Sequence, residues 1–136
     1  MNPFGKIFQI SFVCIFCSCV SASLVSKKDA FSYMDEIRFY HARTSALPFD
    51  KLKEKIGKSG FFYVVSKEGI VEWHPLNMMN GTDVSNLPMI KEIMQKDYGY
   101  GSFDQGGIKR IVMYQTLSDG SKLCFSLDPE EFDEKK

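Results

Sequence analysis

The sequence lacks the residues that most enzyme and nucleic-acid-binding classes require. It contains two histidines, His41 and His74, and no HExxH helix motif, GxSxG nucleophile turn or glycine-rich phosphate loop. It also has no excess of either charge, with 17 basic and 17 acidic residues, so no net positive field attracts nucleic acid or an anionic membrane. We therefore expect a protein that is not an enzyme, carries no metal or other cofactor and does not bind nucleic acid.

Cysteine is scarce where the chain is expected to fold. Cys14, Cys17 and Cys19 lie in an apolar N-terminal run, which leaves Cys124 as the one cysteine of the remaining domain. No disulfide can then form within that domain. Cys124 stands in an apolar strand pattern between Leu123 and Phe125, so we expect a buried, unreactive thiol.

The N-terminal segment resembles a signal peptide. Lys6 precedes an apolar run over residues 7–19, and small residues lead up to a cleavage site after Ala22. The predicted organisation is a signal peptide over residues 1–22 and a single domain over residues 23–136. Residues 23–136 suffice for one hydrophobic core and are too few for two. The predicted location is the periplasm or another extracytoplasmic compartment.

Two other interpretations of this segment remain open. Residues 4–25 are almost long enough to span a bilayer as an uncleaved anchor, although they include several polar residues. The run Phe16–Cys19 also resembles a relaxed lipoprotein processing site, with Cys19 as the lipid acceptor. In that case the protein would be anchored to the membrane by lipid.

The hydrophobic periodicity predicts an α+β fold. Apolar positions three to four residues apart predict an amphipathic helix over residues 24–44 and a short helix over residues 49–56, and a third helix is expected over residues 87–96. Aromatic and β-branched runs predict five strands, over residues 61–65, 70–74, 102–104, 108–117 and 122–127. Gly99 and Gly101 are expected to end the third helix, and Asp128-Pro129 with the charged tail to end the fold. We expect an antiparallel sheet of about five strands with the long N-terminal helix and the short helices on one side.

The segment from Gly60 to Pro75, GFFYVVSKEGIVEWHP, resembles the core signature of the Cache family, in which a hairpin ends in His-Pro. Further matching segments follow in the family's order and spacing, and they are Gly81–Val84, Met89–Ile93, Gly101–Phe103 and Lys109–Tyr114. The resemblance covers residues 24–127, including the long helix that leads from the membrane in this family. It implies a single Cache domain with a PAS-like sheet that cradles a small molecule outside the cytoplasm. Family members usually continue into a second membrane helix and a cytoplasmic output region, whereas this sequence ends at Lys136, so any signal is expected to pass through a membrane signalling partner.

Strand alternation and aromatic polar groups supply candidate ligand-binding residues. Arg110, Val112 and Tyr114 share one strand face, on which Arg110 can bind an anion and Tyr114 can donate a hydrogen bond; alternatively, Arg110 is solvated and Tyr114 belongs to the core. The His74 ring can contact a ligand carboxylate or hydrogen-bond the following loop. The full candidate set is Trp73, His74, Tyr98, Tyr100, Arg110 and Tyr114.

Two functions follow from these observations. The first is a sensor module that binds a small organic ligand such as an organic acid or an amino acid. The second is an envelope docking protein that has the same fold and no small ligand. A homodimer through the N-terminal helix is a further expectation.

Overall fold

The computed structural model describes residues 24–135 of the chain, so the predicted signal peptide and Cys19 lie outside the described residues. The helices are α2 (Lys27–Thr44), α3 (Phe49–Leu52) and α4 (Pro88–Ile93), with short 3₁₀ turns η1 (Asn77–Met79) and η2 (Pro129–Glu131). The strands are β1 (Val25–Ser26), β2 (Phe61–Val65), β3 (Val71–Trp73), β4 (Tyr98–Gln105), β5 (Ile108–Thr116), β6 (Lys122–Leu127) and β7 (Phe132–Asp133). The α+β class predicted from the sequence is confirmed.

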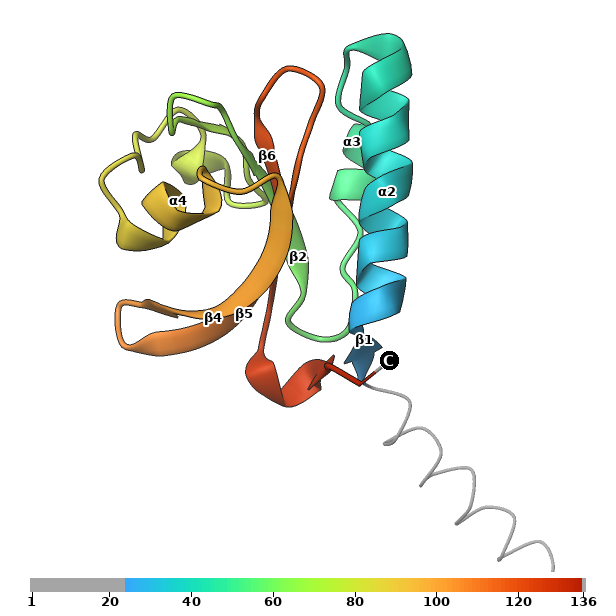
Figure 1. Cartoon of the computed structure of the whole chain (residues 1–136), viewed down its shortest axis with the longest axis vertical. Coiled ribbons are helices and arrows are strands. Elements are labelled where there is room, and N and C mark those ends of the chain that lie inside the picture. The colour runs from blue at the N-terminus through green and yellow to red at the C-terminus, as the bar shows by residue number, and fades with distance from the viewer. Residues whose placement is uncertain (1–23, 136) are drawn as a thin grey trace, which may run out of the picture.

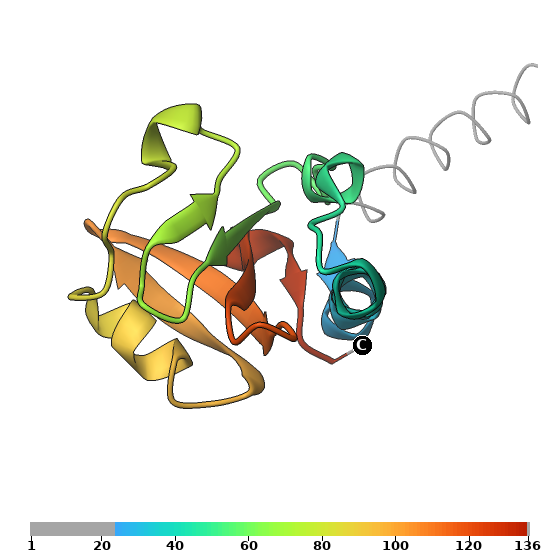
Figure 2. The same ribbon diagram turned by 90° about the horizontal axis from the view of Figure 1, so that it is seen from above.

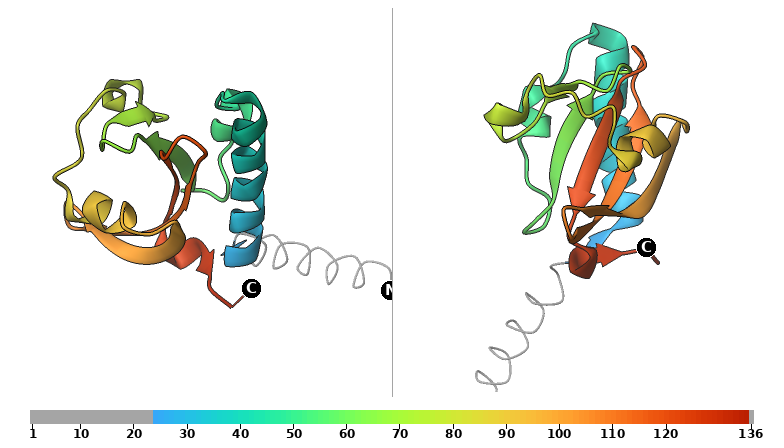
Figure 3. Two further views of the ribbon diagram at one scale, coloured as in Figure 1. Left: turned by 45° about the horizontal axis from the view of Figure 1, so that its top comes forward. Right: turned by 90° about the vertical axis from the view of Figure 1, so that its left-hand side faces the viewer.

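The five longer strands form one antiparallel sheet in the order β3-β2-β6-β5-β4 (Figure 1). The hairpins β2–β3, β4–β5 and β5–β6 each join neighbours in the sequence, whereas β2 and β6 pair at the centre across the whole domain. Figure 3 shows the strands curving around the side on which α4 lies. The sheet therefore forms a concave surface that a short helix can close.

Helix α2 begins and ends at recognisable caps. The Ser26 hydroxyl accepts the N–H of Asp29 at 3.0 Å, and Ser45 ends the helix in a left-handed conformation with its N–H donating to the His41 carbonyl. The buried side chains recur at helical spacing and are Ala30, Met34, Ile37 and His41. This face packs with the first core cluster, against Phe62, Val64 and Phe125.

The helices cover both faces of the sheet, which corrects the prediction that they lie on one side (Figure 2). Phe62 and Val64 pack in the cluster that includes α2, whereas Tyr63 and Val65 pack in a second cluster that includes α4. Side chains alternate across a strand, so the unbroken apolar run of β2 places hydrophobic side chains on both faces of the sheet. One layer of helices cannot bury both.

Strand β4 begins at Tyr98, earlier than predicted, and includes the two glycines that were expected to end α4. Gly99 stands opposite Tyr114 in the sheet. A Cβ atom on Gly99 would lie 2.7 Å from the Tyr114 hydroxyl oxygen, so the strand needs glycine there to let the tyrosine side chain pass. Similarly, the second predicted helix ends at Leu52 as α3, and Ile56 instead forms an isolated bridge with Gly60.

The charged tail does not end the fold, contrary to the prediction. Strand β7 pairs in parallel with β1, with Val25 opposite Phe132. The Glu131 carboxylate accepts the N–H groups of Lys58 and Ser59 at 2.7 and 2.8 Å. The two ends of the described chain therefore lie together at one end of the domain (Figure 1).

Candidate functional site

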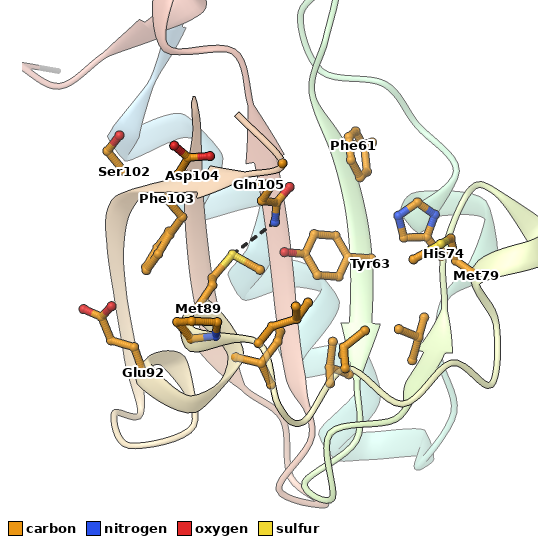
Figure 4. A pocket seen from close by; sticks show the side chains of 17 residues that line it. Phe61, Tyr63, His74, Met79, Met89, Glu92, Ser102, Phe103, Asp104 and Gln105 are labelled. Carbon is orange, nitrogen blue, oxygen red and sulfur yellow. Dashed lines mark hydrogen bonds between the residues drawn. The ribbon is translucent and has the colours of Figure 1, made fainter. Parts of the chain in front are cut away.

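A cavity of about 630 Å³ opens on the face of the sheet that carries α4. Its wall is formed by β2, by the hairpin end and the loop that follows β3, by the start of α4, and by β4 (Figure 4). Most of the lining side chains are apolar, and they include Phe61, Val65, Val71, Met79, Val84, Leu87, Met89, Ile90 and Phe103. A concave apolar lining with few polar groups is typical of small-molecule sites.

The loop after β3 is tied back to the hairpin by backbone hydrogen bonds. The Gly81 N–H donates to the Val71 carbonyl, the Val71 N–H to the Thr82 carbonyl, and the Val84 N–H to the Gly69 carbonyl, all within 2.9 Å. Gly81 has a φ of +83°, which favours glycine. The loop thus has a defined path that holds Met79 and Val84 against the cavity.

Tyr63 is the most deeply buried polar side chain in the cavity wall, with 6% of its surface exposed. Figure 4 shows its hydroxyl pointing into the cavity towards Gln105 and Met89. Among residues 24–135 the hydroxyl has no hydrogen-bond partner of ordinary geometry, although the Cys124 thiol and the Gln105 amide lie near it. Burial raises the pKa of Tyr63 well above 10, so the group is a neutral donor at physiological pH.

His74 lies across the cavity wall from α4, next to the rings of Phe61 and Tyr63 at centroid distances of 5.4 and 5.7 Å. Its Nδ1 accepts the N–H of Leu76 at 3.0 Å. Burial lowers the pKa of His74, which favours the neutral ring near pH 7. A neutral ring that accepts at Nδ1 carries its proton on Nε2, so it offers a second neutral donor.

Strand β4 directs one amide side chain and no charged side chain into the cavity, although Ser102 and Asp104 also border it. Phe103 and Gln105 point into the cavity, whereas Ser102 and Asp104 project to the other side of the strand, as alternation requires (Figure 4). The Gln105 amide nitrogen lies 3.2 Å from the Met89 sulfur, a weak acceptor that a better one can replace. Glu92 lies at the rim, and none of the lining residues in the described part of the chain is lysine or arginine.

Known structures resemble this architecture. No protein-family model matches the sequence, and no curated protein matches it. The extracellular domains of two proteins classed as histidine kinases, mmHK1S-Z2 and rpHK1S-Z16, match with TM-scores of 0.50 at 18% and 13% identity. The matches cover 62% and 72% of this chain, and 38% of each of those domains. The chain has a Cache-like fold.

A further match has a lower TM-score. The ligand-binding domain of Mlp24 with asparagine matches with a TM-score of 0.48 at 17% identity, over 60% of this chain and 33% of that one. The Cache-like chain thus spans between a third and two fifths of the length of these three solved domains. None of the helices between residues 24 and 135 combines the length and hydropathy needed to cross a bilayer.

Of the six candidate residues named from the sequence, His74 lines the cavity of the Cache-like domain, and the other five do not. Trp73 packs against the core under α2, on the opposite face. The register between β2 and β3 shifts at Val64/Val65, which sets Trp73 opposite Val64 and Val71 opposite Val65. This bulge puts Val71 and Trp73 on different faces, although strict alternation would place them together.

The three candidate tyrosines make contacts outside the cavity of the Cache-like domain. Tyr114 is on the cavity's face of the sheet but is buried in the second core cluster. The Tyr100 hydroxyl donates to Glu134 at 2.6 Å, near the end of the described chain. Tyr98 is 72% exposed and lines a separate hollow beside α2 with Phe31 and Asp35.

Arg110 also shares the cavity's face of the sheet, but its guanidinium is bound to the protein. Its Nε donates to the Ser126 hydroxyl and its Nη2 to the Ser59 carbonyl, both at 2.9 Å. The guanidinium carbon lies 5.3 Å from the centre of the Phe61 ring. These contacts connect β5 and β6 to the segment before β2, so Arg110 supports the cavity wall through Phe61.

One polar cluster outside the cavity contains groups that enzymes use. The Ser118 hydroxyl lies 2.9 Å from His41 Nδ1, and Asp119 lies 3.7 Å from His41 Nε2, where the β5–β6 turn meets α2. The His41 ring is buried, and the three residues join the turn to the helix. Within residues 24–135, no three His, Cys, Asp or Glu side chains converge in a way that could hold a metal ion.

Sequence reasoning missed Tyr63 and Gln105. Tyr63 belongs to the apolar run FFYVV, in which an aromatic residue is typical of the hydrophobic core. Alternation within that run separates Phe61, Tyr63 and Val65 from Phe62 and Val64 and thus groups the three cavity residues. The sequence pattern does not reveal which of the two apolar faces remains partly open.

Proposed function

We propose that the chain is an exported, non-enzymatic sensor module that binds a small organic molecule in the cavity beside α4. The observation that supports this most strongly is the buried Tyr63 hydroxyl, which points into an apolar cavity and has no hydrogen-bond partner in the part of the chain that the structure describes. Buried polar groups are nearly always hydrogen-bonded, and an exception of this kind favours an unfilled binding site. The Cache-like fold, shared with the extracellular domains of histidine kinases, supports the same function.

Ligand binding is tested by a thermal-shift screen of the protein against organic acids, amines, amino acids and neutral metabolites. A ligand that binds the folded state raises the melting temperature by linkage. Gln105→Trp places a large side chain in the cavity, and Ser102→Trp places the same side chain on the opposite side of the strand. Stabilisation that is lost in Gln105→Trp and kept in Ser102→Trp would support the proposed site. A screen without any stabilising compound would argue for the docking function.

The proposed export and signalling involve residues and partners outside the structure. We propose cleavage after Ala22 and transmission of the signal to a membrane protein. Cleavage is supported by Lys6, the apolar run and the small residues before Ser23. The homodimer through the N-terminal helix stays a prediction, which sedimentation analysis can test.

A further inference from the structure

The cavity offers three hydrogen-bond donors, and all of them are neutral. They are the Tyr63 hydroxyl, the His74 ring and the Gln105 amide. The Tyr63 hydroxyl is shielded from solvent, whereas His74 is half-buried and Gln105 is exposed. The two carboxylates among the described lining residues are directed away from the Tyr63 hydroxyl. Asp104 projects away from the cavity and accepts the N–H of Gly107 at 2.8 Å, and Glu92 lies at the exposed rim.

The absence of a counter-ion decides which ligands can bind deeply. An ionised group loses its hydration when it enters an apolar cavity, and this loss is offset only by an opposite charge or several strong hydrogen bonds. The charge of the nearest guanidinium, Arg110, reaches Tyr63, but its hydrogen bonds go to Ser126 and Ser59 and it does not line the cavity. The described residues that line the cavity include no lysine or arginine that could replace it. A carboxylate at the depth of Tyr63 would therefore have no cation in direct contact, and only the more distant charge of Arg110 would offset its lost hydration.

The Tyr63 hydroxyl needs an acceptor. Its proton is available because the phenol stays neutral. The Cys124 thiol and the Gln105 amide lie close enough to influence its pKa, but none of the residues in the described part of the chain makes a hydrogen bond of ordinary geometry with it. A buried donor without a partner destabilises the folded protein, and a ligand oxygen placed there would remove that penalty. A carbonyl oxygen can also accept a second bond, from the Gln105 amide beside it.

We propose that the cavity binds an uncharged, largely apolar molecule whose carbonyl or other acceptor oxygen takes the hydrogen bond of the Tyr63 hydroxyl. The proposal rests on the proposed function and specifies its ligand class. It differs from the organic acid or amino acid expected from the sequence, because the arginine on which that expectation depended is engaged outside the cavity. The apolar body of the ligand would lie against Val65, Val84 and Ile90.

Three probes with one shape and different charge test this ligand class. Phenylacetamide, phenylacetate and phenethylamine share a ring and a chain length but are neutral, anionic and cationic at pH 7. Titrations are followed by NMR through the methyl groups of Val65, Val84 and Ile90. We expect phenylacetamide to bind at least tenfold more tightly than the two charged probes.

A pair of matched tyrosine variants tests the role of the hydroxyl. Tyr33 stacks on Phe62 on the other face of the sheet, and its hydroxyl donates to the Lys51 carbonyl and to Glu54. Tyr63→Phe should weaken phenylacetamide by about tenfold, because it removes one hydrogen bond to the ligand. Tyr33→Phe should leave that affinity unchanged. Without ligand, Tyr63→Phe should keep or raise the melting temperature, whereas Tyr33→Phe should lower it.

Each result supports or overturns the proposal. Equal or tighter binding of phenylacetate at these methyl groups, or equal affinity of Tyr63→Phe for phenylacetamide, would overturn the ligand class while leaving a binding cavity. Methyl groups that respond to none of the three probes would also overturn it. In that case, stabilisation by another compound in the broad thermal-shift screen would still support the sensor function. A screen in which no compound stabilises the protein would contradict both the ligand class and the sensor function.

Discussion

Replacing Arg110 by methionine should lower the free energy of unfolding by about 2 to 3 kcal/mol. A hydrogen bond from a charged group contributes about 1.5 to 3 kcal/mol where it is shielded from water. The change keeps the aliphatic part of the side chain and removes two donors. The bond to Ser126 is shielded, since that hydroxyl is 1% exposed, but the Ser59 carbonyl is half-buried and can bond water instead. The contact with Phe61 adds about 0.5 to 1 kcal/mol.

Chemical and thermal denaturation measure this loss. For a domain of this size, about 1 kcal/mol corresponds to roughly 4 °C in melting temperature, so the expected decrease is about 8 to 12 °C. Lys109→Met is the matched control, because Lys109 is an exposed neighbour in the same strand. Equal stability of Arg110→Met and Lys109→Met would refute the structural role. A stable Arg110→Met protein that no longer binds a confirmed ligand would restore the role assigned to Arg110 from the sequence.

The remaining predictions concern the ends of the domain and its thiol. Hydrogen bonds from Ser59 and Lys58 lower the pKa of Glu131 below 4.5, so its contribution to stability is complete above pH 4.5 and is lost as the pH falls through the lower value in the folded state. Glu131→Gln should reduce the acid dependence of unfolding below pH 4.5, and an unchanged pH profile would contradict this assignment. Burial raises the pKa of Cys124 to about 12. Native protein at pH 8 should therefore resist iodoacetamide at Cys124 in peptide mapping, and the unfolded protein should react; rapid labelling of the native state would show that the thiol is accessible. Intact mass of the exported protein should begin at Ser23, whereas a retained Met1 or a lipid on Cys19 would favour the anchor or lipoprotein interpretations.

Local sequence patterns were sufficient to predict most of the fold. The spacing of Ala30, Met34, Ile37 and His41 defines the buried face of α2, and each of these residues is buried. The run FFYVV and the turn after it define the β2–β3 hairpin, whose ends agree with the prediction to within one residue. These elements were predictable because helix periodicity and turn chemistry depend on residues close in the chain.

The candidate site was much less predictable, and the reason is geometric. His74 lines the cavity because a bulge in the β2–β3 pairing separates Val71 from Trp73, and the sequence carries no clear signal for that bulge. Gly99 was interpreted as a helix end, yet it is required by Tyr114 in the neighbouring strand.

The amino-acid sequence by itself determined most of the strand and helix segments, the burial of Cys124 and the apolar character of both faces of β2. Only the tertiary structure decided which face keeps a cavity, because that depends on how α4 and the loop after β3 pack across the curved sheet. It also decided that Arg110 bonds to Ser59 and Ser126, which lie far from it in the chain, and that the Tyr63 hydroxyl has no hydrogen-bond partner among the described residues. A side chain's neighbours are set by packing between distant segments, so its binding role cannot be read from the pattern of its own strand.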